Sequence, residues 1–132
     1  MTMPNGVYIF GGFYSPTTSD FLPKNSNVWQ AGPTIPNGFY RGCGVKISPD
    51  ELLLIGGDLT ENRILKFNVR TNSFSTLQSL QQGRYDHSCV QLNDLILVAG
   101  GFTNTQYHSD WLRSTELIPL ANGTPRYRRA TG

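Results

Sequence analysis

The sequence is poor in charge and in cysteine, and it has no long hydrophobic run. Only 15% of its 132 residues are charged and the formal net charge is +2, which is too small to suggest a nucleic-acid partner. No apolar run reaches the roughly 18 residues of a membrane span, and residues 1–6 lack the charged and apolar regions of a signal peptide. The two cysteines are too few for a disulfide framework. These absences favour a cytoplasmic protein that binds neither nucleic acid nor membrane, and they leave an extracellular location open.

Long helices are also missing, because turn-forming residues interrupt the chain throughout. The 14 glycines and 8 prolines leave no window for a long helix, whereas the 7 Phe, 6 Tyr and 2 Trp favour strands. The length suits one ordinary domain. Many short strands with frequent turn signals indicate an all-β sandwich, barrel or propeller.

A repeat of about 45 residues organises what is present. An apolar run closed by two glycines occurs three times, ending at 11–12, 56–57 and 100–101, so the spacings are 45 and 44 residues. Similar residues recur at a spacing of 45 elsewhere, as in the pairs Trp29/Phe74, Gly38/Gly83, Tyr40/Tyr85 and Val45/Val90. The one-residue difference falls between 47 and 56, in a hairpin turn that can lose a residue without disturbing the strands it joins.

Each unit is predicted to contain four strands, which we name A to D in chain order. The middle unit supplies all four, over about 42–47, 51–55, 63–68 and 73–77. The first supplies B to D over about 7–10, 19–22 and 27–31, and the last supplies A to C over about 88–92, 95–99 and 113–118. The strand at 51–55 is apolar on both faces, as expected of a strand buried on both sides. The pattern therefore predicts ten strands in one domain over 1–124, with pieces at about 7–31, 42–77 and 88–118, and a solvated basic tail over 125–132.

Four-stranded units at this spacing are typical of a β-propeller. Over roughly residues 7–120 the sequence resembles the kelch repeat, on three features: the diglycine after each apolar strand, the run from Arg84 to Ser88 before a strand A, and Trp29 about 17 residues after the first diglycine. Phe74 stands at the matching position in place of the usual tryptophan, and Gly42 stands where His87 would predict a histidine.

The resemblance implies an all-β fold of kelch-type blades, each a four-stranded antiparallel sheet. The aromatic side chains of Trp29 and Phe74 are expected to be core residues that cover the gap between blades. Closed propellers contain about four to eight blades, so two and a half blades make an incomplete ring. We expect a fragment of a longer protein, and self-association of several copies through the open blade edges is the alternative.

Candidate binding residues follow from the same comparison. The B–C loops and the D–A turns open on one face of such blades, and loops on a rigid scaffold concentrate binding residues. The resemblance implies that the residue after each diglycine and those around the D–A arginine line a partner-binding mouth, and the longest loop adds two residues outside the repeat. The candidates are Phe13, Tyr40, Arg41, Asp58, Tyr85, Asp86, Phe102, Tyr107 and His108. Tyr40 and Tyr85 recur with the repeat, so packing of the turn is an alternative role for them.

No catalytic set and no cofactor or metal site stands out. His87 is expected to make a structural hydrogen bond beside a strand, because a metal site would need further ligands at suitable spacing. Cys43 and Cys89 are 46 residues apart, one off the repeat, so they either face each other across a blade interface or point away. Packed sheets lie about 10 Å apart, which is beyond the reach of a disulfide, so free thiols are expected.

We therefore expect a non-enzymatic kelch-type module, or a piece of one, that binds a protein or peptide through its loop-rich face, as in a substrate-recognition adaptor. The alternative is a fragment of a kelch-like enzyme of the galactose-oxidase-like or sugar-processing kind. A stoichiometric metal bound to the purified protein would favour that alternative.

Overall fold

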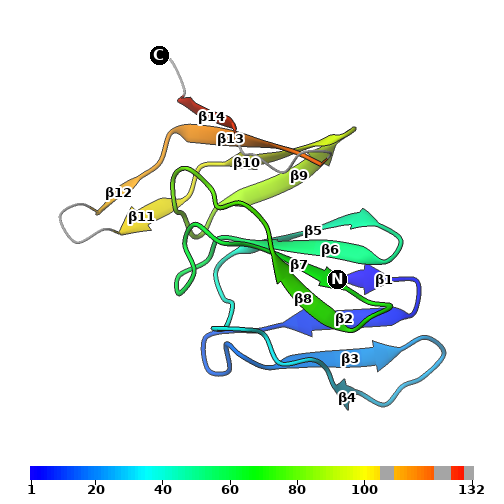
Figure 1. The fold of residues 1–132 in the computed structure, drawn as a ribbon. Coiled ribbons are helices and arrows are strands. Elements are labelled where there is room, and N and C mark those ends of the chain that lie inside the picture. The colour runs from blue at the N-terminus through cyan, green and yellow to red at the C-terminus, as the bar shows by residue number, and fades with distance from the viewer. Residues whose placement is uncertain (105–108, 121–125, 130–132) are drawn as a thin grey trace.

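Three four-stranded antiparallel sheets lie side by side, and a two-stranded hairpin is attached to the third (Figure 1). The computed structural model describes residues 1–104, 109–120 and 126–129. Within these ranges every regular element is a β-strand, and there is no helix long and apolar enough to cross a membrane. The structural comparison reported below supports the predicted class, an all-β protein of propeller blades whose ring is not closed.

Each blade is a simple up-and-down meander of four strands. Blade 1 contains β1 (Thr2–Met3), β2 (Gly6–Phe10), β3 (Ser19–Pro23) and β4 (Gln30–Ala31). Blade 2 contains β5 (Cys43–Ser48), β6 (Glu51–Ile55), β7 (Ile64–Asn68) and β8 (Ser73–Thr76). Blade 3 contains β9 (Ser88–Leu92), β10 (Leu95–Ala99), β13 (Ser114–Pro119) and β14 (Arg126–Arg129). The hairpin β11 (Phe102–Asn104) and β12 (Ser109–Trp111) is inserted between β10 and β13.

The two ends of the chain differ from the sequence-based prediction. Strand β1 pairs with β2 and supplies the innermost strand that we expected to be missing from blade 1. Strand β14 pairs with β13, so the expectation of a basic tail over 125–132 is wrong for residues 126–129. Both strands escaped prediction because a two-residue strand shows no periodicity and the Arg-Tyr-Arg-Arg run has no apolar alternation. The sheets therefore number three complete blades, not two and a half.

Strand β6 carries the centre of the fold. Leu52 and Leu54 pack toward blade 1, and Leu53 and Ile55 pack toward blade 3. All four side chains are at most 3% exposed, which confirms the prediction of a strand buried on both faces. Burial of each such side chain contributes roughly 1.5–3 kcal/mol to folding.

The first blade interface is aromatic. Phe74 on β8 packs against Phe67 and Phe10, with ring centroids 4.8 and 6.5 Å apart, so its expected core role is confirmed. Trp29, at the matching position in blade 1, is 46% exposed, and its expected core role is wrong. Its side of blade 1 faces away from blade 2, where the described residues form no further sheet.

The diglycines bring each strand B close to the linker between blades. The Gly57 amide donates to the carbonyl of Arg84 at 3.0 Å, across the gap between adjacent blades. Gly57 has a φ of +105°, and a Cβ there would lie 2.7 Å from the carbonyl oxygen of Tyr40. A side chain at this position would therefore collide with backbone, which is why close approach requires glycine.

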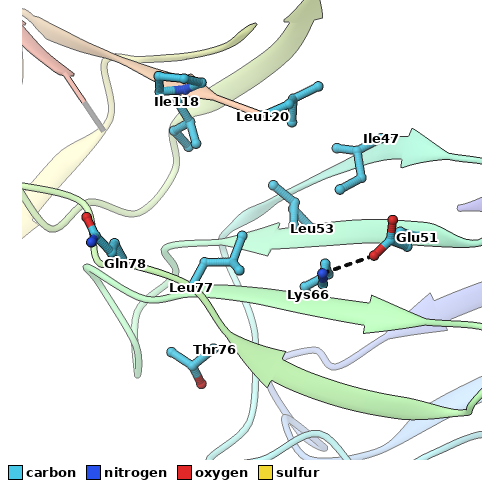
Figure 2. Close-up of a pocket in the computed structure, with 10 residues that line it drawn as sticks. Ile47, Glu51, Leu53, Lys66, Thr76, Leu77, Gln78, Ile118 and Leu120 are labelled. Carbon is cyan, nitrogen blue, oxygen red and sulfur yellow. Dashed lines mark ion pairs between the residues drawn. The ribbon is translucent and has the colours of Figure 1, made fainter. Parts of the chain in front are cut away.

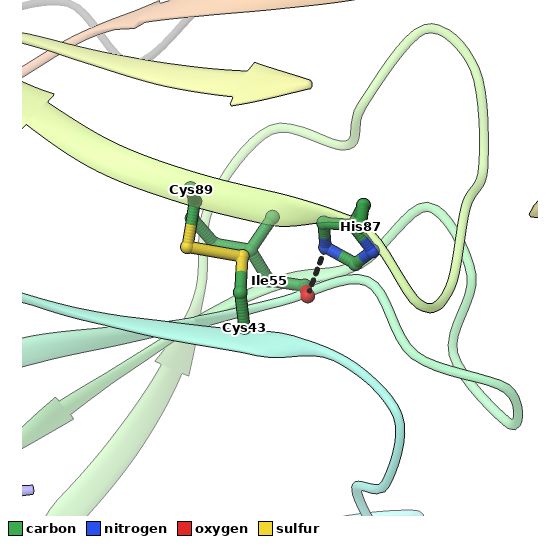
Figure 3. Close-up of a disulfide and its surroundings, with 4 residues drawn as sticks. All are labelled: Cys43, Ile55, His87 and Cys89. Atoms are coloured by element: carbon green, nitrogen blue, oxygen red, sulfur yellow. Dashed lines mark hydrogen bonds between the residues drawn. A yellow bond between two sulfur atoms is a disulfide. The ribbon is translucent and has the colours of Figure 1, made fainter. Parts of the chain in front are cut away.

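A disulfide joins Cys43 on β5 to Cys89 on β9 (Figure 3). The two cysteines face each other across the interface of blades 2 and 3, and the expectation of free thiols is wrong. Their Cα atoms are 6.0 Å apart, within the range that a disulfide spans. The spacing of about 10 Å holds for sheets packed face to face, whereas blades fan out, so their innermost strands lie closer together.

Candidate binding surface on the loop face

The B–C loops and the D–A linkers gather on one side of the stack, at the left of Figure 1. We call this side the loop face, and it comprises residues 11–18, 39–42, 56–62, 84–87, 101–104 and 109–113. The A–B and C–D turns lie on the opposite side. Backbone hydrogen bonds fix the loop face, because the amide of Asp58 donates to the carbonyl of Tyr40 at 3.0 Å and the amide of Asp86 donates to the carbonyl of Arg41 at 2.7 Å.

Arg41 lies at the centre of the loop face and joins two blades. Its Nε donates to Asp86 Oδ1 at 2.9 Å, and its Nη2 donates to the other oxygen of the same carboxylate. Its Nη1 lies 3.5 Å from Asp58 Oδ2, and the guanidinium carbon lies 4.5 Å from the ring centroid of Tyr85. A two-point pair combined with ring stacking holds a guanidinium in one orientation.

Tyr40 extends this network toward blade 1. Its hydroxyl donates to Asp58 Oδ2 at 2.8 Å, and its ring meets that of Phe13 at 5.8 Å. On the other side the ring of Tyr85 packs against that of Phe102, and the ring of Phe102 packs against that of Trp111, with ring centroids 5.4 and 4.9 Å apart. The result is a continuous band of rings and charges across the loop face.

The charges shift one another's ionisation in the directions expected for paired groups. The hydrogen bond from Arg41 lowers the pKa of Asp86 and in turn raises the pKa of the Arg41 guanidinium. The hydrogen bond to Asp58 raises the pKa of the Tyr40 hydroxyl. The network thus holds the guanidinium of Arg41 against the side chains of Asp58 and Asp86, all partly open to water.

Seven of the nine candidate residues meet in this band, namely Phe13, Tyr40, Arg41, Asp58, Tyr85, Asp86 and Phe102. Tyr107 and His108 lie outside the described residues. Tyr85 is only 6% exposed, so its role is the alternative one of packing the turn, where it supports Arg41 from below. Phe13 is 71% exposed.

Two exposed aromatic residues on the loop face were not among the candidates. Trp111 is 68% exposed and Tyr14 is 94% exposed, and Tyr14 contacts Phe13 at 5.0 Å. Tyr14 has no counterpart in the repeat. Trp111 is located only by the pairing of β11 with β12, which brings it next to Phe102. The one sequence signal for Trp111 was its place at the end of a loop that is longer than the matching loops of the other two repeats.

A buried ion pair fixes the linker between blades 2 and 3, beneath the loop face. Arg84 and Glu116 have side chains that are 0% exposed, with Nη2 and Oε2 3.3 Å apart. Glu116 also accepts from the amides of Gln81 and Gln82 at 2.7 and 2.9 Å, and Arg84 donates to the carbonyl of Ser114 at 3.0 Å. The sequence did not reveal this pair, because the corresponding positions of the preceding repeat, Phe39 and Leu65, are apolar.

His87 plays the structural part expected of it. Its Nε2 forms a hydrogen bond with the carbonyl of Ile55 at 2.9 Å, close to the disulfide (Figure 3). Burial lowers the pKa of His87 to about 4, so the ring is neutral at pH 7 and Nε2 carries the donated proton. Its Nδ1 is buried without a hydrogen-bond partner.

A cavity of about 440 Å³ opens between blades 2 and 3 at their outer part, away from the loop face (Figure 2). Its walls are mainly aliphatic, including Leu53, Leu77 and Ile118, and the Lys66–Glu51 ion pair at 3.0 Å closes one side. At the first blade interface, aromatic side chains occupy the positions equivalent to Leu53 and Ile118, namely Tyr8 and Phe67. A smaller hollow of about 370 Å³ lies between blades 1 and 2, where Tyr8 and Val69 are among its lining residues.

Comparison with known proteins shows the fold but no family. No family model and no curated protein matches the chain. The solved structure of YjhT superposes with a TM-score of 0.78 and 18% sequence identity, over 96% of this chain and 49% of that one. The chain thus spans about half the length of that structure. A likeness at this identity shows the fold alone, and within the described residues no group of three His, Cys, Asp or Glu side chains is placed to hold a metal ion.

Proposed function

We propose that the chain is a kelch-type interaction module that binds a protein or peptide segment through its loop face, as a substrate-recognition adaptor does. The observation that carries this proposal is the band of aromatic and charged side chains running from Phe13 through Arg41 to Trp111. Packing of the blades accounts for Tyr85, but it does not require Phe13 and Trp111, which are largely exposed. Exposed aromatic residues beside an arginine are typical of the residues that dominate protein interfaces.

The charges of the band suggest which segments it prefers. Two carboxylates, Asp58 and Asp86, surround the single guanidinium of Arg41, so the band carries excess negative charge. Exposed ring faces next to carboxylates suit a Lys or Arg side chain, because a cation gains from both the ring and the charge. The partner segment is therefore expected to be basic with at least one aromatic or aliphatic anchor.

Selection from a displayed library of random linear peptides tests this function. The wild-type chain should enrich basic peptides, and the double variant Phe13→Ala, Trp111→Ala should bind them at least about tenfold more weakly, since each lost anchor costs about 1–2 kcal/mol. Val28→Ala, at an exposed apolar position off the loop face, serves as a matched control and should bind normally. No enrichment, or equal binding by the loop-face variant, would contradict the proposal.

The disulfide changes the expected compartment. The expectation of a cytoplasmic protein depended in part on unpaired cysteines, and both cysteines of the chain are paired. Disulfides persist mainly in oxidising environments, so the proposed module belongs to an oxidising compartment. Thiol labelling of protein taken directly from its source, which should find no free cysteine, checks this assignment.

A further inference from the structure

Each of the two end sheets has one side that faces no other sheet of the described residues (Figure 1), and apolar side chains are exposed on that side. We call the free side of blade 1 the leading face, formed by Val7, Ile9, Leu22 and Trp29. We call the free side of blade 3 the trailing face, formed by Val90, Leu92, Leu97 and Leu117. Ile9, Trp29, Val90 and Leu92 are 46–51% exposed, which is unusual for Ile9 on a central strand and for Val90 and Leu92 on an innermost strand.

The leading face repeats a pattern that is buried elsewhere in the same molecule. By strand pairing, Val7 and Ile9 on β2 occupy the positions that Leu52 and Leu54 occupy on β6. The latter two are 0% and 3% exposed, because blade 1 covers them. The same positions in blade 3, Ile96 and Val98, are 0% exposed. The leading face therefore has apolar side chains at positions that a preceding blade covers in blades 2 and 3.

The trailing face of blade 3 is equivalent to the side of blade 2 that packs against blade 3. Val90 pairs with Leu97 across β9 and β10, as Val45 pairs with Leu53 across β5 and β6. Val45 and Leu53 are 8% and 0% exposed because blade 3 covers them. Blade 3 thus presents equivalent side chains on its own free side, where the described residues form no further sheet.

The number of blades indicates what covers these faces. Three blades cannot close a propeller, which needs about four to eight, and the chain spans 49% of the YjhT structure that it resembles in fold. Two copies of the chain have three blades each and together match that length. A twofold axis would place each trailing face on the other copy's leading face, forming two identical interfaces and leaving no free apolar sheet.

We propose that two copies of this chain close one six-bladed propeller, with blade 3 of each copy packed on blade 1 of the other. The two loop faces then form one rim that carries two copies of the Arg41 network. The trailing face of each copy contacts the leading face of the other, so the two contacts are related by the twofold axis and the ring closes with two copies.

Light scattering on the purified chain, with two variants, tests this assembly. The wild type of 14.7 kDa should have a mass of about 29 kDa. Ile9→Lys on the leading face and Val90→Lys on the trailing face should each give a monomer, because each variant alters both interfaces of its own dimer. Leu59→Lys, at a loop position that is 55% exposed, should leave the dimer intact.

Mixing the two monomeric variants separates a ring from any other dimer. An Ile9→Lys copy keeps a normal trailing face and a Val90→Lys copy keeps a normal leading face, so an equimolar mixture should form a heterodimer through one intact interface. A dimer that survives one of the two variants unchanged would mean that like faces pair, and the proposal would be wrong. A monomeric wild type would also overturn it and would mean that other blades cover these faces.

Discussion

At the scale of single residues, the second blade interface depends on buried polar groups. His87 is held neutral between blades 2 and 3, where it binds the carbonyl of Ile55, and the pKa of its ring is lowered from 6.5 to about 4. The unfolded chain takes up a proton as the pH falls through 6.5, whereas the folded chain does not until the pH is near 4. Folding is therefore favoured above pH 6.5, and this contribution is lost as the pH falls toward 4.

The pH dependence can be measured against a variant that keeps the hydrogen bond. Between pH 6.5 and 4 the His87 contribution should remove up to about 3 kcal/mol of the free energy of unfolding. His87→Gln can still donate to the Ile55 carbonyl but does not titrate, so urea denaturation should show a smaller loss in that variant over the same range. Parallel curves for the two proteins would refute the buried neutral histidine.

The buried ion pair gives a second residue-scale prediction. Glu116→Leu leaves Arg84 buried without its carboxylate and removes the acceptor of two backbone amides, so it should lower the free energy of unfolding by about 3–5 kcal/mol. The double variant Arg84→Met, Glu116→Leu, which restores the apolar character of the preceding repeat, should be less destabilised than the single one. A single variant as stable as the wild type would contradict the ion pair.

At the scale of strands, the disulfide ties the innermost strands of blades 2 and 3. It closes a loop between cysteines 46 residues apart, for which a stabilisation of about 2–4 kcal/mol is typical. Adding a reductant should lower the wild-type denaturation midpoint accordingly. The variant Cys43→Ser, Cys89→Ser should start at the lower midpoint and not respond, and a wild type that ignores the reductant would show that the bond is absent.

The cavity between the same two blades predicts a stabilising substitution. Ile118→Phe places at this wall the ring that Phe67 supplies at the first interface, and it should raise the free energy of unfolding by about 0.5–2 kcal/mol. Val98→Phe, at a fully buried position of β10 that does not line the cavity, should instead lower it by about 1–3 kcal/mol through overpacking. Equal destabilisation by both variants would mean that the cavity does not exist as described.

At the scale of the whole molecule, the repeat explains why so much of the fold could be predicted. Strands such as β6 and β10 were located to the residue, because an apolar run closed by two glycines marks both ends. The disulfide could not be predicted, because it depends on how closely the innermost strands converge. The exposure of Trp29 likewise depends on which blades are present, and the Arg84–Glu116 pair breaks the repeat that served as the guide.

The repeat also predicted much of the candidate site, but only the residues at repeated positions. Repeat positions beside the diglycines identified the residues that now form the Arg41 network, because backbone hydrogen bonds fix those loops in every blade. The repeat did not identify Trp111 and Tyr14, because these residues have no equivalents in the other repeats. Whether the loop face binds a partner is a question of surface chemistry that no packing pattern answers.

Amide and indole chemical shifts of the labelled chain, recorded by NMR during titration with the most enriched basic peptide, test the central claim most directly. We expect the largest changes at Tyr40, Arg41, Asp58 and Asp86 and at the Trp111 indole, with saturation at one peptide per chain. The far side of the stack, around Glu51, Lys66 and Pro119, should remain unchanged. Changes confined to that far side, or spread evenly over the chain, would contradict a binding surface on the loop face.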